Sequence, residues 1–446
     1  MSGTVAIVGS GPSGFFVADM LLKSDIRPTV HMFDRLPTPF GLVRSGVAPD
    51  HPSIKSVSRV FDQIARHERF SFLGNVEIGK DIPLDTLRRH YSAVVLAYGA
   101  SVDNEVDVPG RHLDGVISAG KFVGWYNGHP DFAGFKPNLN AQDVVIVGHG
   151  NVALDVARIL LTKTALLART DIADHALEAL LTSNVRTVRL VGRRGPLQAS
   201  FTTAEIRELL LKTDGVRVQF EGGALSLSDE DIAELEKPAN ALIKRNVEIM
   251  REAAARKSGE CVRTLKISFL ESPAAVLGSS RMEQVILRKN ELASTNDVIR
   301  AVPTMVQRTI NAGMLVTSVG FSGRPLCGAP FDGRLGRIPN IKGRVLPRGL
   351  QEAPLYVAGW IKRGAHGVIG SNKMDAAETA TAMIEDFQRN KWLTTELGTL
   401  PRHVTFDDWR IIDAAEIEAG RPQNRPRRKI VSIPKMLEML PARGLQ

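Results

Sequence analysis

The chain has 446 residues, of which 43% are hydrophobic and 24% charged, a composition typical of a globular protein with two or three domains. No apolar run approaches the roughly 18 to 20 residues of a membrane span, which argues against an integral membrane protein. Cys261 and Cys327 form no C-x-x-C pair, which argues against a disulfide framework, a cysteine-ligated cluster and a dithiol redox centre. Lys and Arg outnumber Asp and Glu by 57 to 48, a surplus that favours acidic partners or phosphorylated ligands.

The first recognisable pattern occupies residues 5–34. An apolar strand leads into Gly9, Gly11 and Gly14, a helical stretch follows, and a second strand ends at Asp34. Such a βαβ unit with a G-x-G-x-x-G turn binds a dinucleotide, and an acid at the end of the second strand suits a ribose 2′-hydroxyl. The pattern therefore predicts the adenosine half of FAD or NAD, against the alternative of a structural Gly-rich turn. Because it begins at Val5 without a leader, we expect a cytoplasmic protein or a processed organellar form.

A Pro- and Gly-rich stretch follows at residues 35–58. It has no periodic pattern and predicts a loop that wraps a ligand. We then expect a helix at 59–69, short strands at 70–82 and a buried strand at 94–99 that passes beneath the dinucleotide. Residues 106–140, which contain Trp125, read as a connection between domains.

The opening pattern returns at residues 144–161, with Gly148, Gly150 and Ala153 in the three key positions. The next strand ends at Arg193 and Arg194, where an acid would otherwise stand. Two guanidinium groups can hold a phosphate, so this second site is predicted to prefer NADP(H) to NAD(H). The alternative is a surface basic pair.

The remaining stretches complete the predicted architecture. Residues 203–213 and 228–257 read as charged helices, with a basic face that is either solvated or binds a partner, and the basic run 421–429 reads as a solvated tail. Short strands from Leu265 lead to a buried strand and turn at 314–325. At 355–387 a strand, a Gly-rich turn and a long helix starting near Asn372 form another place to receive a ligand. We predict an α/β fold of two Rossmann-like domains: an FAD domain at 1–105 and 325–446, interrupted by an NADP domain at 106–324.

Six blocks resemble, in content and order, the adrenodoxin reductase family of NADPH:ferredoxin oxidoreductases, a branch of the glutathione-reductase-like flavoproteins. They are GSGPSGF at 9–15, PFGLVRSGVAPDHP at 39–52, GWYNGHP at 124–130, GHGNVALDVARILL at 148–161, VGRRGPLQASFT at 191–202 and AGWIKRGAHGVIG at 358–370. The resemblance covers nearly the whole chain and is weakest at 215–300. It implies FAD and NADP(H) as cofactors, hydride transfer from NADPH to FAD, and single electrons passed to a ferredoxin that supplies an acceptor such as a cytochrome P450.

The resemblance also implies site residues. With the motif glycines, the FAD contacts are Gly9, Gly11, Ser13, Gly14, Asp34, Leu42, Ile78, Trp360, Gly367, Val368 and Ile369. The NADP(H) contacts are His149, Gly150, Asn151, Val152, Arg193, Arg194, Glu205 and Gly367. Hydride transfer needs no acid, base or nucleophile from the chain, so His51 and Glu205 are expected to tune the site or supply a proton, and His51 is equally well a structural histidine. No metal site is expected.

The family's partner is an acidic iron-sulfur protein such as a [2Fe-2S] ferredoxin, and here Lys244 and Arg245 are the expected contacts. No repeat or heptad demands a dimer, so a monomer is expected. Two positions depart from the family: His149 replaces a glutamine, and GAHG at 364–367 replaces Gly-Pro-Thr/Ser-Gly. A histidine can titrate near neutral pH, so His149 is expected to alter the affinity for NADP(H) or its pH dependence.

Four other functions share parts of this pattern. A thioredoxin- or glutathione-type reductase needs a redox-active cysteine pair, and the electron-input subunit of a complex such as glutamate synthase carries cysteine-rich cluster motifs; this sequence has neither. A flavin-dependent monooxygenase or NADPH oxidase would consume oxygen without a ferredoxin. A nucleotide sensor would have no use for two dinucleotide sites.

Overall fold

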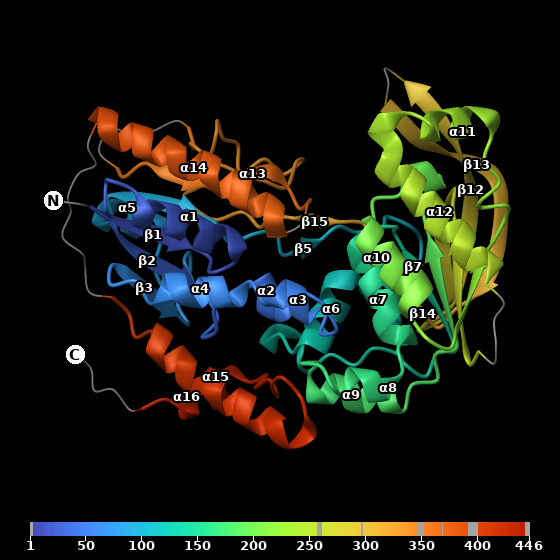
Figure 1. Ribbon diagram of the computed structural model, residues 1–446, viewed down its shortest axis with the longest axis horizontal. Coiled ribbons are helices and arrows are strands. Elements are labelled where there is room, and N and C mark those ends of the chain that lie inside the picture. Colours follow the sequence, from blue (N-terminus) through green and yellow to red (C-terminus); the bar gives the residue numbers. More distant parts are fainter. Residues whose placement is uncertain are drawn as a thin grey trace. The chain divides into compact units, whose positions relative to one another are not determined.

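The structure is a computed structural model that describes residues 3–256, 261–295, 298–346, 352–367, 369–390 and 400–441 (Figure 1). The chain forms two compact units. The first contains Met1–Val102, Asn127–Pro130 and Gly320–Gln446, and the second contains Asp103–Tyr126 and Asp131–Val319. Among the described residues, no helix is both long enough and apolar enough to cross a membrane.

The first unit is built on a five-stranded parallel sheet in the order β16-β4-β1-β2-β3. The apolar stretches predicted as strands form its centre, because a parallel sheet covered on both faces requires continuous hydrophobic runs. The strands are β1 (Thr4–Val8), β2 (Thr29–Asp34), β3 (Phe70–Gly74), β4 (Ala93–Leu96) and β16 (Leu355–Val357).

Helices cover one face of this sheet, where Phe15, Phe61 and Met383 are fully buried. In Figure 1, α1 and α14 lie side by side along the sheet, and they pack directly on each other. The other face is closed by α5 and by residues 326–345, including Ile338. The helices of the first unit are α1 (Pro12–Lys23), α2 (Leu42–Ser45), α3 (Pro52–Lys55), α4 (Ser58–Ala65), α5 (Leu84–His90), α13 (Trp360–Arg363), α14 (Ile369–Asn390), α15 (Phe406–Gly420) and α16 (Ile433–Glu438).

The second unit contains a six-stranded parallel sheet in the order β6-β14-β7-β8-β10-β9. Its strands are β6 (Val116–Ser118), β7 (Asp143–Val147), β8 (Thr187–Val191), β9 (Val216–Phe220), β10 (Arg263–Ser268) and β14 (Met314–Thr317). The helices of this unit are α6 (Ala119–Asn127, whose last residue belongs to the first unit), α7 (Asn151–Leu161), α8 (Thr164–Leu167), α9 (Asp174–Leu181), α10 (Thr203–Arg207), α11 (Asp229–Leu235) and α12 (Ala241–Ala255).

A three-stranded antiparallel sheet packs on the parallel sheet of the second unit. It consists of β11 (Glu271–Gly278), β12 (Met282–Thr295) and β13 (Val298–Asn311). An ion-pair network joins the two sheets: Arg308 of β13 contacts Glu221 at 2.9 Å, and Glu221 also contacts Arg189 of β8 at 3.1 Å. The short strands β5 (Val102–Asp103) and β15 (Phe321–Ser322) stand where the chain leaves the first unit and where it has returned to it.

Several predicted local structures were wrong in detail. The loop at 35–58 contains the one-turn helices α2 and α3, and α14 begins at Ile369 instead of near Asn372. Residues 106–140 are more than a connection, because α6 buries Trp125 in the second unit. The strands after Leu265 are not all short, since β12 and β13 have 14 residues each.

The basic run 421–429 is solvated only at its start, where residues 421–424 are exposed, and the prediction of a solvated tail is wrong for the rest. Arg425 is only 6% exposed and Lys429 only 7% exposed. Between α15 and α16, the part of the run from Arg425 to Lys429 packs back on the first unit, where Lys429 donates hydrogen bonds to two backbone carbonyls.

Candidate functional site

The first glycine turn connects β1 to α1. Gly9 has a φ of +107°, which only glycine adopts easily, and a Cβ on Gly14 would lie 2.2 Å from the Gly9 carbonyl oxygen. Gly11 differs, because a Cβ there would meet no protein atom within 4 Å. The space above Gly11, at the amino end of α1, is therefore open to a ligand whose negative charge the helix dipole would favour.

Asp34 stands at the end of β2, as predicted, and its carboxylate is held by its neighbours. The Ser10 backbone N–H and hydroxyl donate to one oxygen at 3.0 and 2.5 Å, and the Leu36 N–H donates to the other at 3.0 Å. These bonds fix the carboxylate beside the glycine turn. The oxygen that accepts only from Leu36 keeps a lone pair for a ligand hydroxyl.

A pocket opens next to Asp34. Its walls come from three parts of the chain: the stretch after β2, residues 128–130, and α16. The lining residues are Asp34, Leu36, Thr38, Pro39, Gly41, Arg44, Ser45, Gly128, His129, Pro130 and Met436. Residues 35–58 therefore do line a cavity, together with a C-terminal helix that the sequence did not indicate.

The turn after β16 faces the same glycine motif. A Cβ on Gly359 would lie 2.2 Å from the Ser13 hydroxyl of α1, and Gly359 itself has a φ of +79°. Trp360 stacks on Phe321 with ring centroids 6.3 Å apart. Its buried indole N–H has no hydrogen-bond partner in the described structure, so this donor is left for a bound ligand.

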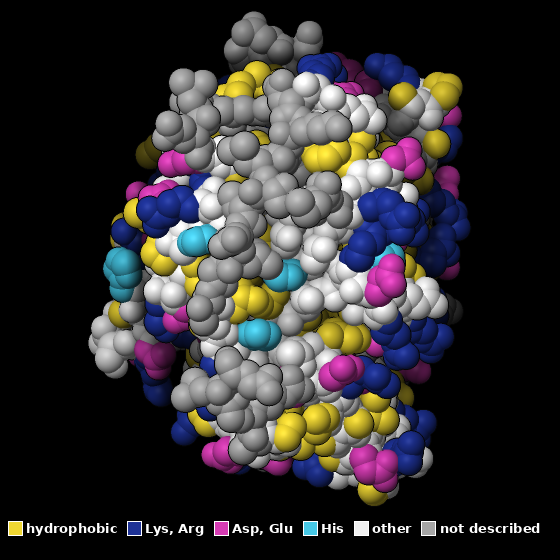
Figure 2. Space-filling view, turned by 90° about the vertical axis from the view of Figure 1, so that its left-hand side faces the viewer, with side chains coloured by type: hydrophobic (Ala, Val, Ile, Leu, Met, Phe, Trp, Pro, Cys, Tyr) yellow, Lys and Arg dark blue, Asp and Glu magenta, His cyan; other side chains and the backbone are white. Residues whose placement is uncertain are grey.

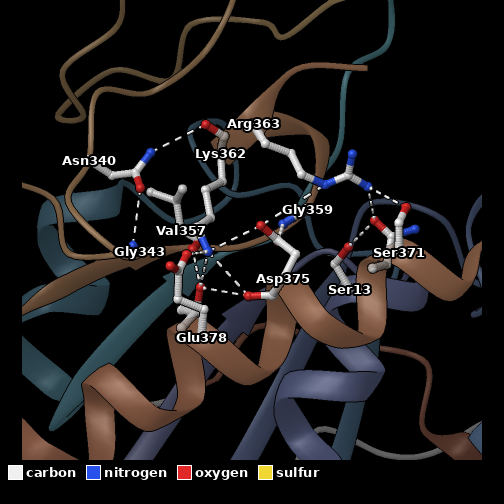
Figure 3. Close-up of polar contacts among 12 residues, drawn as sticks. Ser13, Asn340, Gly343, Val357, Gly359, Lys362, Arg363, Ser371, Asp375 and Glu378 are labelled. Atoms are coloured by element: carbon white, nitrogen blue, oxygen red, sulfur yellow. Dashed lines mark hydrogen bonds and ion pairs between the residues drawn. The ribbon is translucent and has the colours of Figure 1, made fainter. Parts of the chain in front are cut away.

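Lys362 and Arg363 fix this turn to α14, a role that no pattern in the sequence indicates. Figure 3 shows both side chains reaching from α13 towards the first turns of α14. Lys362 is 6% exposed and contacts Asp375 at 3.1 Å, while the Asp375 carboxylate accepts the Gly359 N–H at 2.5 Å. Arg363 donates to Asn372 at 2.8 Å and to the backbone carbonyl of His366. Asn372 also accepts from Ser13 at 3.2 Å, so one polar network links α1, α13 and α14.

The other predicted FAD contacts lie in different surroundings. Leu42 begins α2 and is 47% exposed, whereas Ile78 is buried in the core on the far face of the sheet. Gly367 is exposed, with a φ of +84°, and Ile369 begins α14 and packs against the core. Val368 lies outside the described residues.

His51 precedes α3 in the same unit. Its side chain is 12% exposed, and its Nε2 atom lies 4.0 Å from the Asp50 carboxylate. The histidine is thus largely buried, on the stretch 35–58 that the sequence predicts to wrap a ligand.

The second glycine turn, between β7 and α7, repeats the first. Gly148 has a φ of +132°, and a Cβ there would lie 2.2 Å from the Ser318 carbonyl oxygen. Gly150 caps α7, and the Asn151 side chain accepts the Thr202 N–H at 2.8 Å. Val152 follows on the first turn of the helix and is half-buried.

Arg193 and Arg194 follow directly after β8. Arg193 is exposed and Arg194 is half-buried, and neither guanidinium has a hydrogen-bond or ion-pair partner among the described residues. The backbone around them is held, since the Asn290 side chain donates to the Arg193 carbonyl at 3.1 Å. Two unpaired cations on a fixed strand end form a suitable binding site for a phosphate.

Glu205 lies on α10 and is 9% exposed. Arg158 of α7 contacts its carboxylate at 3.3 Å and the Asp155 carboxylate at 2.6 Å. Glu205 is therefore part of an acidic pair that shares one buried arginine.

His149 lies in the second glycine turn, but it does not titrate near neutral pH. Burial lowers its pKa to about 4, even though a hydrogen bond to the Leu190 backbone acts to raise it. The ring packs edge-on against Phe269 at 4.5 Å. The expectation of a neutral-range titration at His149 is wrong, because the residue is removed from water.

The predicted partner contacts on α12 are already paired. Lys244 contacts Glu236 at 2.8 Å, and Arg245 contacts Glu248 at 2.7 Å, all at the surface. Figure 2 views the side of the molecule that lies at the left of Figure 1, which does not include α12; there too, Lys and Arg side chains gather along one edge with acidic and apolar side chains among them. The surplus of positive charge is thus partly balanced locally.

The residues present fit two dinucleotides. The open space over Gly11, the orphan indole N–H of Trp360 and the acid at Asp34 suit FAD in the first unit. The unpaired arginines after β8 suit the 2′-phosphate of NADP(H) in the second.

The chain is similar to proteins of known name over almost its full length. It is 44% identical to the NADPH-ferredoxin reductase FprA of Mycobacterium tuberculosis, covering 98% of both chains. It is 40% identical to the human mitochondrial NADPH:adrenodoxin oxidoreductase, covering 98% of this chain and 91% of the relative. The solved structure of M. tuberculosis FprA in complex with NADPH matches with a TM-score of 0.90 at 43% identity, covering 98% and 99% of the two chains. No model of a protein family matches the chain.

Proposed function

The chain belongs to the family of NADPH-ferredoxin and NADPH:adrenodoxin reductases, and we propose that it oxidises NADPH and reduces a ferredoxin. It is an FAD-dependent ferredoxin–NADP(+) reductase with the two-domain flavoprotein fold. The observation that carries this function is the contrast between the two strand ends, an acid at Asp34 and unpaired arginines at 193 and 194.

The first unit is proposed as the FAD domain. FAD, when bound, accepts a hydride from NADPH and passes electrons on one at a time. Gly9, Gly11, Gly14 and the amino end of α1 would receive its diphosphate, and Asp34 its adenosine ribose. Ser13, Leu42, Ile78 and the turn from Trp360 to Ile369 would complete the site; the polar network of Lys362 and Arg363 supports this by holding that turn in place.

The second unit is proposed as the NADP(H) domain. His149, Gly150, Asn151 and Val152 would receive the diphosphate at the amino end of α7, while Arg193 and Arg194 would bind the 2′-phosphate. Glu205 in this unit, and His51 in the first unit, are each proposed to tune the reaction or supply a proton. Glu205 is poised by its contact with buried Arg158, which fixes the orientation of its carboxylate.

The electron acceptor is proposed to be an acidic ferredoxin, of the [2Fe-2S] or another type, bound by a monomeric reductase. Lys244 and Arg245 are the proposed contacts on α12. Because each is paired with a glutamate, binding would exchange an internal carboxylate for one of the partner, so each contact would add little net affinity.

Stopped-flow reduction tests the proposal. The FAD-loaded protein is mixed with NADPH or with NADH at equal concentration, and oxidised ferredoxin is then added under anaerobic conditions. We expect fast flavin bleaching with NADPH, much slower bleaching with NADH, and recovery of the flavin absorbance on adding ferredoxin. Bleaching without recovery until oxygen is admitted would identify an NADPH oxidase instead, and equal rates with both nucleotides would remove the 2′-phosphate role of the arginines.

A further inference from the structure

We propose that the C-terminal segment 405–441 retains FAD in the first unit, with Glu416 as the positioning residue. The inference rests on the proposed function, because it takes the pocket beside Asp34 to receive the adenosine half of FAD. Its starting point is the basic run 421–429, which is packed against the unit and holds two walls of that pocket.

Glu416 of α15 is the centre of the packed region. Its carboxylate has no solvent-exposed surface and is bound on both oxygens. Arg44 donates to both oxygens at 2.8 and 2.5 Å, Arg427 approaches at 3.3 Å, and the Ile430 N–H donates at 2.8 Å. Burial acts to raise the pKa of this carboxyl, but the two arginines outweigh it and hold the pKa below its usual value. Glu416 is therefore a charged, fully engaged carboxylate.

Arg44 connects this centre to the ligand pocket. It lies on α2 within the stretch that follows Asp34, and it lines the pocket itself. Its guanidinium lies over the Trp409 ring at 5.0 Å, so α15 holds Arg44 both by charge and by stacking. An arginine fixed at both ends of its fork cannot swing into or out of the pocket.

Lys429 ties together the two walls that lie on either side of the pocket. Its ammonium group donates to the Arg44 carbonyl at 3.0 Å and to the Asn127 carbonyl at 3.0 Å. Ser45 and Gly128, the residues that follow these carbonyls, both line the pocket. The third wall is Met436 of α16, which belongs to the C-terminal segment.

The three walls are far apart in the sequence, so their approach depends on these contacts. Removing one partner of a buried ion pair leaves an uncompensated charge and is strongly destabilising. The stretch around Arg44 would then move away from residues 127–130, and a ligand would have to order both walls on binding. Weakened retention of FAD is the expected result, without an effect on the reacting end of the cofactor.

The test compares Glu416→Gln with Glu418→Gln. Glu418 lies two residues away on the same helix and pairs with Arg421 at the surface, which makes it a matched control. FAD release is followed by the fluorescence of free flavin, and the Kd is measured by titrating FAD into the apoprotein. We expect Glu416→Gln to raise the Kd at least tenfold, with kcat at saturating FAD within twofold of wild type, while Glu418→Gln leaves both unchanged.

A second variant guards against simple misfolding. Lys429→Met removes the tie between the two walls and leaves the Glu416 pair intact, so it should also raise the Kd for FAD. Binding of NADP⁺ to the same preparations reports whether the second unit is folded. If Glu416→Gln does not fold, the Kd for FAD of the Lys429→Met variant tests the inference in its place.

A Kd for FAD within twofold of wild type in the folded variants would overturn the inference. A fall in kcat at saturating FAD with an unchanged Kd would overturn it as well. Wild-type protein that cannot bind FAD at all would instead refute the proposed function.

Discussion

Acidification should destabilise the second unit through His149. The unfolded chain takes up a proton at this side chain near its ordinary pKa of 6.5, whereas burial delays protonation in the folded chain to about pH 4. Between these values the unfolded state binds more protons, so stability is retained above pH 6.5 and is lost as the pH falls towards 4. The same burial keeps His149 neutral from pH 6 to 8, so it should give the KM for NADPH no pH dependence there.

The size of the effect follows from the two pKa values. One pKa unit corresponds to about 1.4 kcal/mol, so the full shift is worth roughly 3 kcal/mol, of which roughly 2 kcal/mol is already lost at pH 5. His149→Gln keeps a hydrogen-bonding side chain but cannot be protonated. The difference in the free energy of unfolding between wild type and this variant, measured with urea from pH 7.5 to 4.5, should therefore change by about 2.5 kcal/mol in favour of the variant.

His31 provides a matched comparison in the first unit. Burial, and to a lesser degree repulsion from His403, lowers its pKa to about 4 as well, and its Nδ1 atom lies 2.9 Å from the Tyr91 hydroxyl. His31→Gln should relieve acid sensitivity in the first unit, so the two variants should act on different units. If His149→Gln loses as much stability as wild type between pH 7.5 and 4.5, the burial argument fails.

Three further predictions concern the ligand sites. Gly14→Ala should lower the melting temperature, because its Cβ would lie 2.2 Å from a backbone oxygen and such overpacking costs about 1–3 kcal/mol. Gly11→Ala should instead weaken FAD binding at an unchanged melting temperature, because its Cβ would have no protein atom within 4 Å. Replacing Arg193 and Arg194 by Gln should raise the KM for NADPH by about 10- to 100-fold and leave the KM for NADH unchanged, since a charged hydrogen bond contributes about 1.5–3 kcal/mol; equal effects on both would contradict the assignment. Lys244→Ala should raise the KM for ferredoxin only a few-fold, and only at low ionic strength, because salt screens an exposed ion pair. An increase in KM that persists in high salt would show that the contact is buried.

The parts of the site that were predictable are those fixed by neighbouring residues. The turns at Gly9 and Gly148 need positive φ, and the strand before each is a continuous apolar run, so a window of about 30 residues contains the whole requirement. Boundaries were less predictable: α14 begins at Ile369 because that side chain packs on the core, a tertiary contact that outweighs the preceding glycines. The helix that carries Trp125 was not predicted for a similar reason: it is stabilised by the burial of this side chain in the second unit, which is a tertiary contact.

Contacts between distant parts of the chain left no such local signal. Glu416 and Arg44 are 372 residues apart. Glu416 stands near other acidic residues, as on an exposed helix, and Arg44 lies in a Gly-containing stretch without charged neighbours, so neither position indicates a buried ion pair. Runs rich in Arg and Lys are usually solvated because burying a cation is costly, and that cost is avoided here only because Asp413, Glu416 and backbone carbonyls receive the run. The same composition therefore describes a free tail or a wall of a binding pocket, and only the position of the receiving groups in space distinguishes the two.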